Sequence, residues 1–180
     1  MSGQAILSHP YDTVHLPATG FDVAIEAGPD QRAALAEAYD LVAVEGLSAT
    51  ATLMPAGGRL VAVEGRVTAD IVQSCVVSLE PVAQRIDETF QVRYAPAGAA
   101  DAQGPAGKEV AIDPEAPDPP EAMQDTTIDV GALVEEMFVL AIDPYPRAPG
   151  AELSDVGAGE PESGEESPFA VLRGVVRSGK

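Results

Sequence analysis

Val61-Ala-Val-Glu-Gly-Arg-Val-Thr-Ala-Asp-Ile71 places apolar residues and one glycine at odd positions, with polar or small residues between them. Residues 82–94 alternate in the same way. The side chains of a strand alternate between two faces, so each stretch predicts a strand with one apolar face. Ser78 and Pro81 between them favour a chain reversal. The sequence therefore predicts a long antiparallel hairpin whose turn carries Cys75, the only cysteine of the chain.

Two further strands are predicted over residues 21–27 and 47–54 by the same alternation. The pattern falls out of phase before Glu45-Gly46, which indicates a β-bulge. Gly28-Pro29-Asp30 is typical of a helix start and predicts a helix that ends near residue 39. The strands together predict an antiparallel meander, free to curl toward a barrel.

A helix over residues 129–142 is predicted to cover the apolar face of this sheet. Asp129 suits the N-cap, and Pro144 ends the helix by disfavouring helical geometry at the residue before it. The expected buried stripe has helical spacing, and Glu135 and Glu136 are expected to be solvated outside it. The stripe comprises Val130, Leu133, Val134, Met137 and Ala141, broadened by Phe138 and Leu140. The fold class is therefore α+β, an antiparallel sheet covered by one main helix.

Three segments are predicted around and within this fold. Residues 1–20 form an N-terminal arm, residues 21–147 a single α+β domain, and residues 148–180 a disordered linker with a short amphipathic end. Residues 96–125 hold six prolines and seven acidic residues. That composition buries too little surface to offset chain ordering, so it predicts a mobile acidic insertion.

The C-terminal end combines an apolar helical face with basic residues, after an acidic linker. Two interpretations stand: a docking segment for another surface, in cis or in trans, or a terminal helix packed on its own domain. The residues concerned are Phe169, Leu172, Arg173, Val176 and Arg177.

The net charge of −19 is the main bulk feature of the chain. Binding to exposed RNA phosphates needs clustered Lys and Arg, and the sequence offers no cluster. A basic partner protein fits better, although acidic loops can also serve solubility alone. The sequence shows neither a membrane span nor a signal peptide, so we expect a cytoplasmic protein.

Residues capable of catalysis are not grouped in the sequence. Cys75 would need a neighbouring base, and both histidines, His9 and His15, lie far away along the chain. Adjacent carboxylates such as Glu135 and Glu136 point apart on a helix. We expect a protein without catalytic residues, metal ligands or cofactors, and therefore not an enzyme.

Cys75-Val-Val-Ser-Leu79-Glu-Pro81, together with residues 128–144, resembles the bacterial YceD family. The resemblance covers residues 21–147 and a short stretch at residues 167–172, and it implies a role in accumulation of large-subunit (23S) ribosomal RNA. The partner it implies is the pre-ribosomal large subunit or a basic ribosomal protein, with any direct RNA contact confined to a small surface. The matching residues, whose roles are unassigned, are Cys75, Leu79, Pro81, Asp129, Leu133, Glu136, Leu140 and Pro144.

Many proteins of this family carry further cysteines in an arrangement that suggests a zinc site. Here Ser78 stands where the second of these cysteines would be, and no cysteine follows the helix. One thiolate cannot make a structural zinc site, which needs four ligands. The chain is thus of a metal-free branch, or has lost a metal that the fold does not need.

Overall fold

The predicted hairpin is the longest feature of the fold. Strand β4 (Val61–Ser74) and strand β5 (Pro81–Ala95) pair antiparallel without interruption, from Val61 opposite Tyr94 to Ser74 opposite Pro81. The odd residues of β4 other than Gly65 are buried, as their alternation predicts, with Val63 and Val67 fully enclosed. The hairpin is therefore confirmed, with one face in the core and one in solvent.

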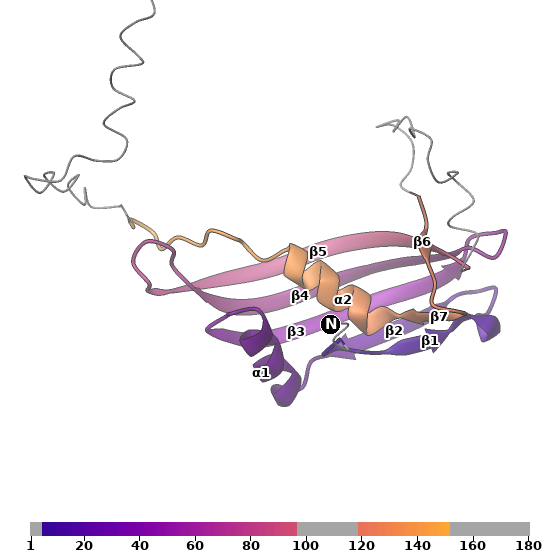
Figure 1. The fold of residues 1–180 in the computed structure, drawn as a ribbon, viewed down its shortest axis with the longest axis horizontal. Helices are drawn as coiled ribbons and strands as arrows, with labels where there is room; N and C mark the ends of the chain where they lie inside the picture. The colour runs from indigo at the N-terminus through magenta and orange to yellow at the C-terminus, as the bar shows by residue number, and fades with distance from the viewer. Residues whose placement is uncertain (1–4, 97–118, 152–180) are drawn as a thin grey trace, which may run out of the picture. The chain divides into compact units, whose positions relative to one another are not determined.

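The computed structural model describes residues 5–96 and 119–151, and Figure 1 shows them as one sheet with helices on one face. Strand β3 (Ala43–Pro55) pairs with β4, and strand β2 (Phe21–Glu26) pairs with β3. The register of β3 shifts between Val44 and Gly46, so the predicted bulge is confirmed. The sheet has the order β2-β3-β4-β5-β6 and remains open.

A short strand follows the acidic insertion. Strand β6 (Glu121–Ala122) pairs in parallel with Tyr94 and Ala95 of β5, and the next residue, Met123, is buried. The expected end of the insertion at residue 125 is therefore too late. The rest of the insertion, residues 97–118, lies outside the described residues.

The N-terminal residues form a second, two-stranded ribbon beside the sheet. Strand β1 (Pro10–Asp12) pairs antiparallel with strand β7 (Thr127–Asp129), and a short 3-10 helix η1 (Thr13–His15) follows β1. The chain divides into two compact units, Met1–Ala148 and Pro149–Lys180. The second contains the predicted C-terminal segment, which lies outside the described residues.

Helix α2 (Val130–Leu140) packs on the core face of β4 and β5, as predicted (Figure 1). It starts after Asp129 as expected and ends two residues before the expected residue 142. Asp129 caps the helix by accepting a hydrogen bond from the Ala132 N–H. Leu133 and Phe138 are buried as expected. Three residues of the predicted stripe are placed differently: Met137 and Ala141 are only partly buried, and Leu140 is 72% exposed.

The prediction for Glu135 is wrong. Its side chain is buried, and one carboxylate oxygen accepts a hydrogen bond from the Leu7 backbone N–H at 3.0 Å. The other oxygen accepts from the Tyr39 hydroxyl at 2.7 Å. Tyr39 follows helix α1 (Pro29–Ala38), so one carboxylate joins the N-terminal segment, α1 and α2. Burying a charged group requires such partners, and these two donors supply them.

Asp129 holds the same N-terminal segment one turn earlier on α2. It accepts hydrogen bonds from the Ser8 hydroxyl and the His9 N–H, both at 2.7 Å. Burial raises the pKa of Asp129, but these bonds and those from the start of α2 outweigh it and lower the pKa. Gly131 allows the close approach, because a Cβ there would lie 1.5 Å from the Leu7 carbonyl oxygen. Residues 7–9 are therefore clamped against α2.

Replacement of Leu133 by alanine should destabilise the fold, because Leu133 is 2% exposed at the interface between α2 and the sheet. We expect a loss of roughly 2–5 kcal/mol in the free energy of unfolding, measured by urea denaturation. Leu140→Ala on the same helix is the matched control and should change it by about 0.5 kcal/mol or less. Equal losses would mean that α2 is rotated from the position described.

The contact between Tyr39 and Glu135 predicts a dependence of stability on alkaline pH. Burial, and then the hydrogen bond to Glu135, raises the pKa of Tyr39 to about 12. Its value in the unfolded chain is about 10, so the stabilisation is complete below that pH and is lost as the pH rises toward 12. The difference in unfolding free energy between the wild-type protein and Tyr39→Phe should therefore shrink over this range. A constant difference would contradict the assignment.

Candidate functional site

The turn between β4 and β5 is closed by backbone hydrogen bonds around Cys75. The Cys75 N–H donates to the Glu80 carbonyl at 2.8 Å, and the Leu79 N–H donates to the Cys75 carbonyl at 3.0 Å. Leu79 adopts a left-handed backbone with φ of 62° and exposes 77% of its surface. The turn thus presents a large apolar side chain to solvent from a strained position.

The Cys75 sulfur is buried and surrounded by hydrogen-bond donors. Its Sγ accepts from the backbone N–H groups of Val77 and Ser78, both at 3.4 Å, and of Ala148 at 3.3 Å. The Ser78 hydroxyl and these N–H groups, that of Ser78 foremost, lower the pKa of the Cys75 thiol to about 6. The arrangement stabilises a thiolate that joins the turn to a segment beyond α2.

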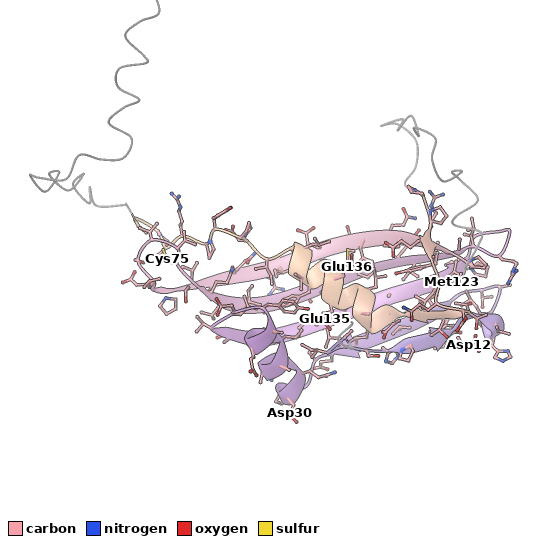
Figure 2. The ribbon with its side chains drawn as sticks, in the orientation of Figure 1. Asp12, Asp30, Cys75, Met123, Glu135 and Glu136 are labelled. Atoms are coloured by element: carbon pink, nitrogen blue, oxygen red, sulfur yellow. The ribbon has the colours of Figure 1, made fainter. Side chains whose placement is uncertain are left out.

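We call that segment, residues 141–148, the strap. The side chain of Gln84 bonds to it twice, donating to the Ala141 carbonyl and accepting from the Asp143 N–H. Gln73 donates to the Asp143 carbonyl at 2.9 Å, and the Val76 N–H donates to the Pro146 carbonyl at 2.9 Å. The strap therefore runs from the end of α2 to the turn at Cys75, where Figure 2 places that residue at the far end of the hairpin.

Cys75 and the two histidines, which we did not expect to form a catalytic group, lie in different parts of the fold. His9 and His15 belong to the N-terminal ribbon, while Cys75 lies at the end of the hairpin (Figure 2). Ser78 contacts the sulfur through its backbone N–H and its hydroxyl. Within the described ranges, no three His, Cys, Asp or Glu side chains are grouped as metal ligands would be. The chemical feature of this turn is the set of hydrogen bonds that the Cys75 sulfur accepts from backbone N–H groups.

The exposed side of α2 carries Glu136 and Leu140, which are four residues apart and share one helical face. Figure 2 shows Glu136 on the side of α2 nearer to β5, with Glu135 on the opposite side. Burial, and then the charges of Glu121, Glu136 and Asp129, raises the pKa of Tyr94 on β5. The surface between α2 and the end of β5 is therefore acidic, and Leu140 adds one exposed apolar side chain to it.

The solvent face of the sheet is polar and includes ion pairs between neighbouring strands. Arg66 binds Asp87 at 2.5 Å from the neighbouring strand, and Arg85 binds Asp70 at 3.0 Å. Opposite charges directly across a pair of strands stabilise the pairing modestly. These two arginines are therefore committed to the sheet.

The sequence profile of one protein family, described as Large ribosomal RNA subunit accumulation protein YceD, matches residues 63–175. The match begins in β4, includes the turn at Cys75, the strap and α2, and covers more than half of the chain. The chain belongs to the YceD family. No curated protein and no solved structure matches it. Among the described residues, no helix is long and apolar enough to cross a membrane.

The YceD signature residues predicted from the sequence separate into three structural groups. Cys75, Pro81 and Pro144 lie in or beside the turn and the strap. Asp129 and Leu133 build the start and the buried face of α2. The remaining three, which the structure exposes to solvent, are Leu79, Glu136 and Leu140. The predicted docking segment lies beyond the described residues, although the YceD profile extends into it as far as residue 175.

Three groups have structural roles that the sequence does not predict: the Glu135 side chain, the Ala148 backbone N–H and the Met123 side chain. Glu135 occupies a buried position inside an apolar stripe, and its adjacency to Val134 was the available signal. No sequence signal indicates the roles of the Ala148 N–H and the Met123 side chain. A backbone donor and a methionine after a proline-rich stretch have no periodic pattern. Their roles depend on contacts between residues far apart in the chain.

The thiolate arrangement predicts that the contribution of Cys75 to stability depends on pH. Its folded pKa of about 6 lies below the ordinary thiol value, so the contribution is present above the unfolded pKa and is lost as the pH falls through the folded one. We expect the loss of unfolding free energy in Cys75→Ala to grow as the pH rises from about 6 to about 9.

Thermal denaturation of both proteins across this range, with ultraviolet absorbance of the thiolate, measures the effect. Val77→Ala serves as the control, because it keeps the backbone N–H and should show a constant difference. A pH-independent loss in Cys75→Ala would contradict a folded-state thiolate.

Proposed function

We propose that this protein is a non-enzymatic, cytoplasmic factor that supports the accumulation of 23S ribosomal RNA by contacting protein components of the large subunit. The observation that carries the proposal is the YceD profile match, whose description names large ribosomal RNA subunit accumulation. The fold supports a binding role, because Leu79 at the hairpin turn and Glu136 and Leu140 on α2, all residues of the family signature, are exposed to solvent.

Electrostatics favours protein over RNA as the direct partner. The chain has 29 acidic and 10 basic residues, and a negative field repels RNA phosphates. Arg66 and Arg85, the cations at the centre of the solvent face, are held by carboxylates of neighbouring strands. Any contact with RNA is therefore confined to a small surface, and the larger area suits a basic protein.

A second candidate function is an acidic chaperone that binds one basic ribosomal protein, with the effect on RNA following from that. The net charge of −19 favours it, because a strongly negative surface binds and solubilises a basic polypeptide. The non-enzymatic role fits the state of Cys75, whose sulfur is enclosed by backbone donors and inaccessible to a substrate.

Capture of the tagged full chain from cell lysate, with and without ribonuclease, separates the two candidates. Recovery of several large-subunit proteins that is lost with ribonuclease supports binding to a pre-ribosomal particle. Recovery of one basic ribosomal protein that resists ribonuclease supports the chaperone. In either case, depletion of the protein should lower the ratio of 23S to 16S ribosomal RNA. An unchanged ratio would overturn the proposed function.

A further inference from the structure

Strand β5 is an outer strand of the sheet over most of its length. Within residues 5–96 and 119–151, its only partner on the side away from β4 is β6, which pairs with Tyr94 and Ala95. Figure 1 shows the rest of β5 running along the margin of the sheet. Exposed edges of this kind are templates for pairing with another chain.

The backbone groups that point outward can be assigned from one hydrogen bond. The Ala95 carbonyl accepts from the Met123 N–H at 2.8 Å, so Ala95 directs its backbone away from β4. In an antiparallel strand alternate residues turn their N–H and C=O groups to the same side. The outward residues preceding it along β5 therefore include Ala83, Arg85, Asp87, Thr89 and Gln91.

None of these five residues has a backbone hydrogen bond on its outward side to any residue within 5–96 or 119–151. They offer five N–H donors and five carbonyl acceptors over roughly 30 Å of strand. The side chains of Arg85 and Asp87 are paired within the sheet and leave this backbone open. The edge is thus a regular row of unused donors and acceptors.

The chemistry beside the edge indicates what would occupy it. Glu88 lies opposite the buried Val67, so it points to the side of the sheet that carries α2, yet it is exposed. On the same side, α2 presents Glu136 and the 72% exposed Leu140. A strand added to β5 would direct alternate side chains toward these groups. On that side, basic side chains would match Glu88 and Glu136, and an apolar side chain would match Leu140.

We propose that β5 binds an extended, basic segment of a partner protein as an additional strand of the sheet. The proposal rests on the proposed function, since it names the place where a basic ribosomal protein would be held. Backbone hydrogen bonds to residues 83–91 provide affinity, and Glu88, Glu136 and Leu140 select basic and apolar side chains on the side of the added strand that faces α2. The exposed signature residues Glu136 and Leu140 thereby acquire a role.

Thr89→Pro tests the edge directly. Thr89 directs its N–H outward, so proline removes a donor needed by an added strand while keeping the ladder with β4. Ala24→Pro is the matched control: Ala24 is an exposed residue of β2, and its outward N–H faces away from β3 at the opposite margin of the sheet. Melting temperature and circular dichroism establish that both variants remain folded.

The probe is a short fluorescent peptide of alternating valine and lysine, with a peptide of alternating proline and lysine as the control for charge alone. We expect the full chain to bind the first peptide and Thr89→Pro to weaken binding by about tenfold, a loss of hydrogen bonding along the edge. Ala24→Pro should bind as the wild type does. Glu136→Lys should weaken binding by about fivefold, while Glu37→Lys on the exposed side of α1 should have a smaller effect.

Amide hydrogen exchange of the full chain identifies the bound residues. Binding of the valine-lysine peptide should slow exchange at Arg85, Asp87, Thr89 and Gln91, and leave the outward amides of β2 unchanged. If the four β5 amides are already protected without peptide, at every protein concentration, this chain covers its own edge. Protection that rises with protein concentration would mean that a second copy pairs there. Either result, or equal binding by Thr89→Pro, overturns the proposal.

The two proposals fail in different ways. If Thr89→Pro still recovers large-subunit proteins and restores 23S ribosomal RNA in depleted cells, the edge is not the binding place and the proposed function stands. If the wild-type protein fails in those assays, the proposed function fails, whatever the peptide binds. Loss of recovery in Thr89→Pro together with normal recovery by Ala24→Pro supports both.

Discussion

The buried carboxylate of Glu135 is the interaction on which the arrangement of the helices depends. It receives the Leu7 N–H and the Tyr39 hydroxyl, and thereby fixes the N-terminal segment and the end of α1 against α2. A buried charge without these donors would be strongly unfavourable, so the three segments must take one mutual position. That position sets the rotation of α2, with Leu133 and Phe138 inward and Glu136 and Leu140 outward.

The turn between β4 and β5 is held by a different kind of contact. There the Cys75 sulfur gathers backbone N–H groups from its own turn and from Ala148, so a single residue joins the hairpin and the strap. Ser78 provides one of those donors at the position where YceD relatives carry a second cysteine. Hydrogen bonding to one sulfur thus connects elements that a metal with four ligands could otherwise join.

Sequence periodicity predicted most of the strands and the main helix, but it did not predict the buried polar contacts. Alternation predicted β4 and β5, the phase shift at Gly46 predicted the bulge, and helical spacing with Asp129 predicted α2. Those signals are local. Glu135, Met123 and Ala148 are placed by contacts with distant parts of the chain, and a charged residue inside an apolar stripe has the same local pattern whether solvated or buried. The exposure of Leu140 follows from the same rotation of α2 that buries Glu135.

The clamp on the N-terminal segment also constrains when the protein can finish folding. Leu7 and Glu135 are separated by 128 positions in the sequence, so the segment around Leu7 can be fixed only after the much later residues of α2 have been synthesised. The hairpin and its neighbouring strands can pair earlier, because their partners are consecutive. Until α2 is synthesised, the apolar face of β4 and β5 lacks the cover that this helix provides, and aggregation is a hazard during translation.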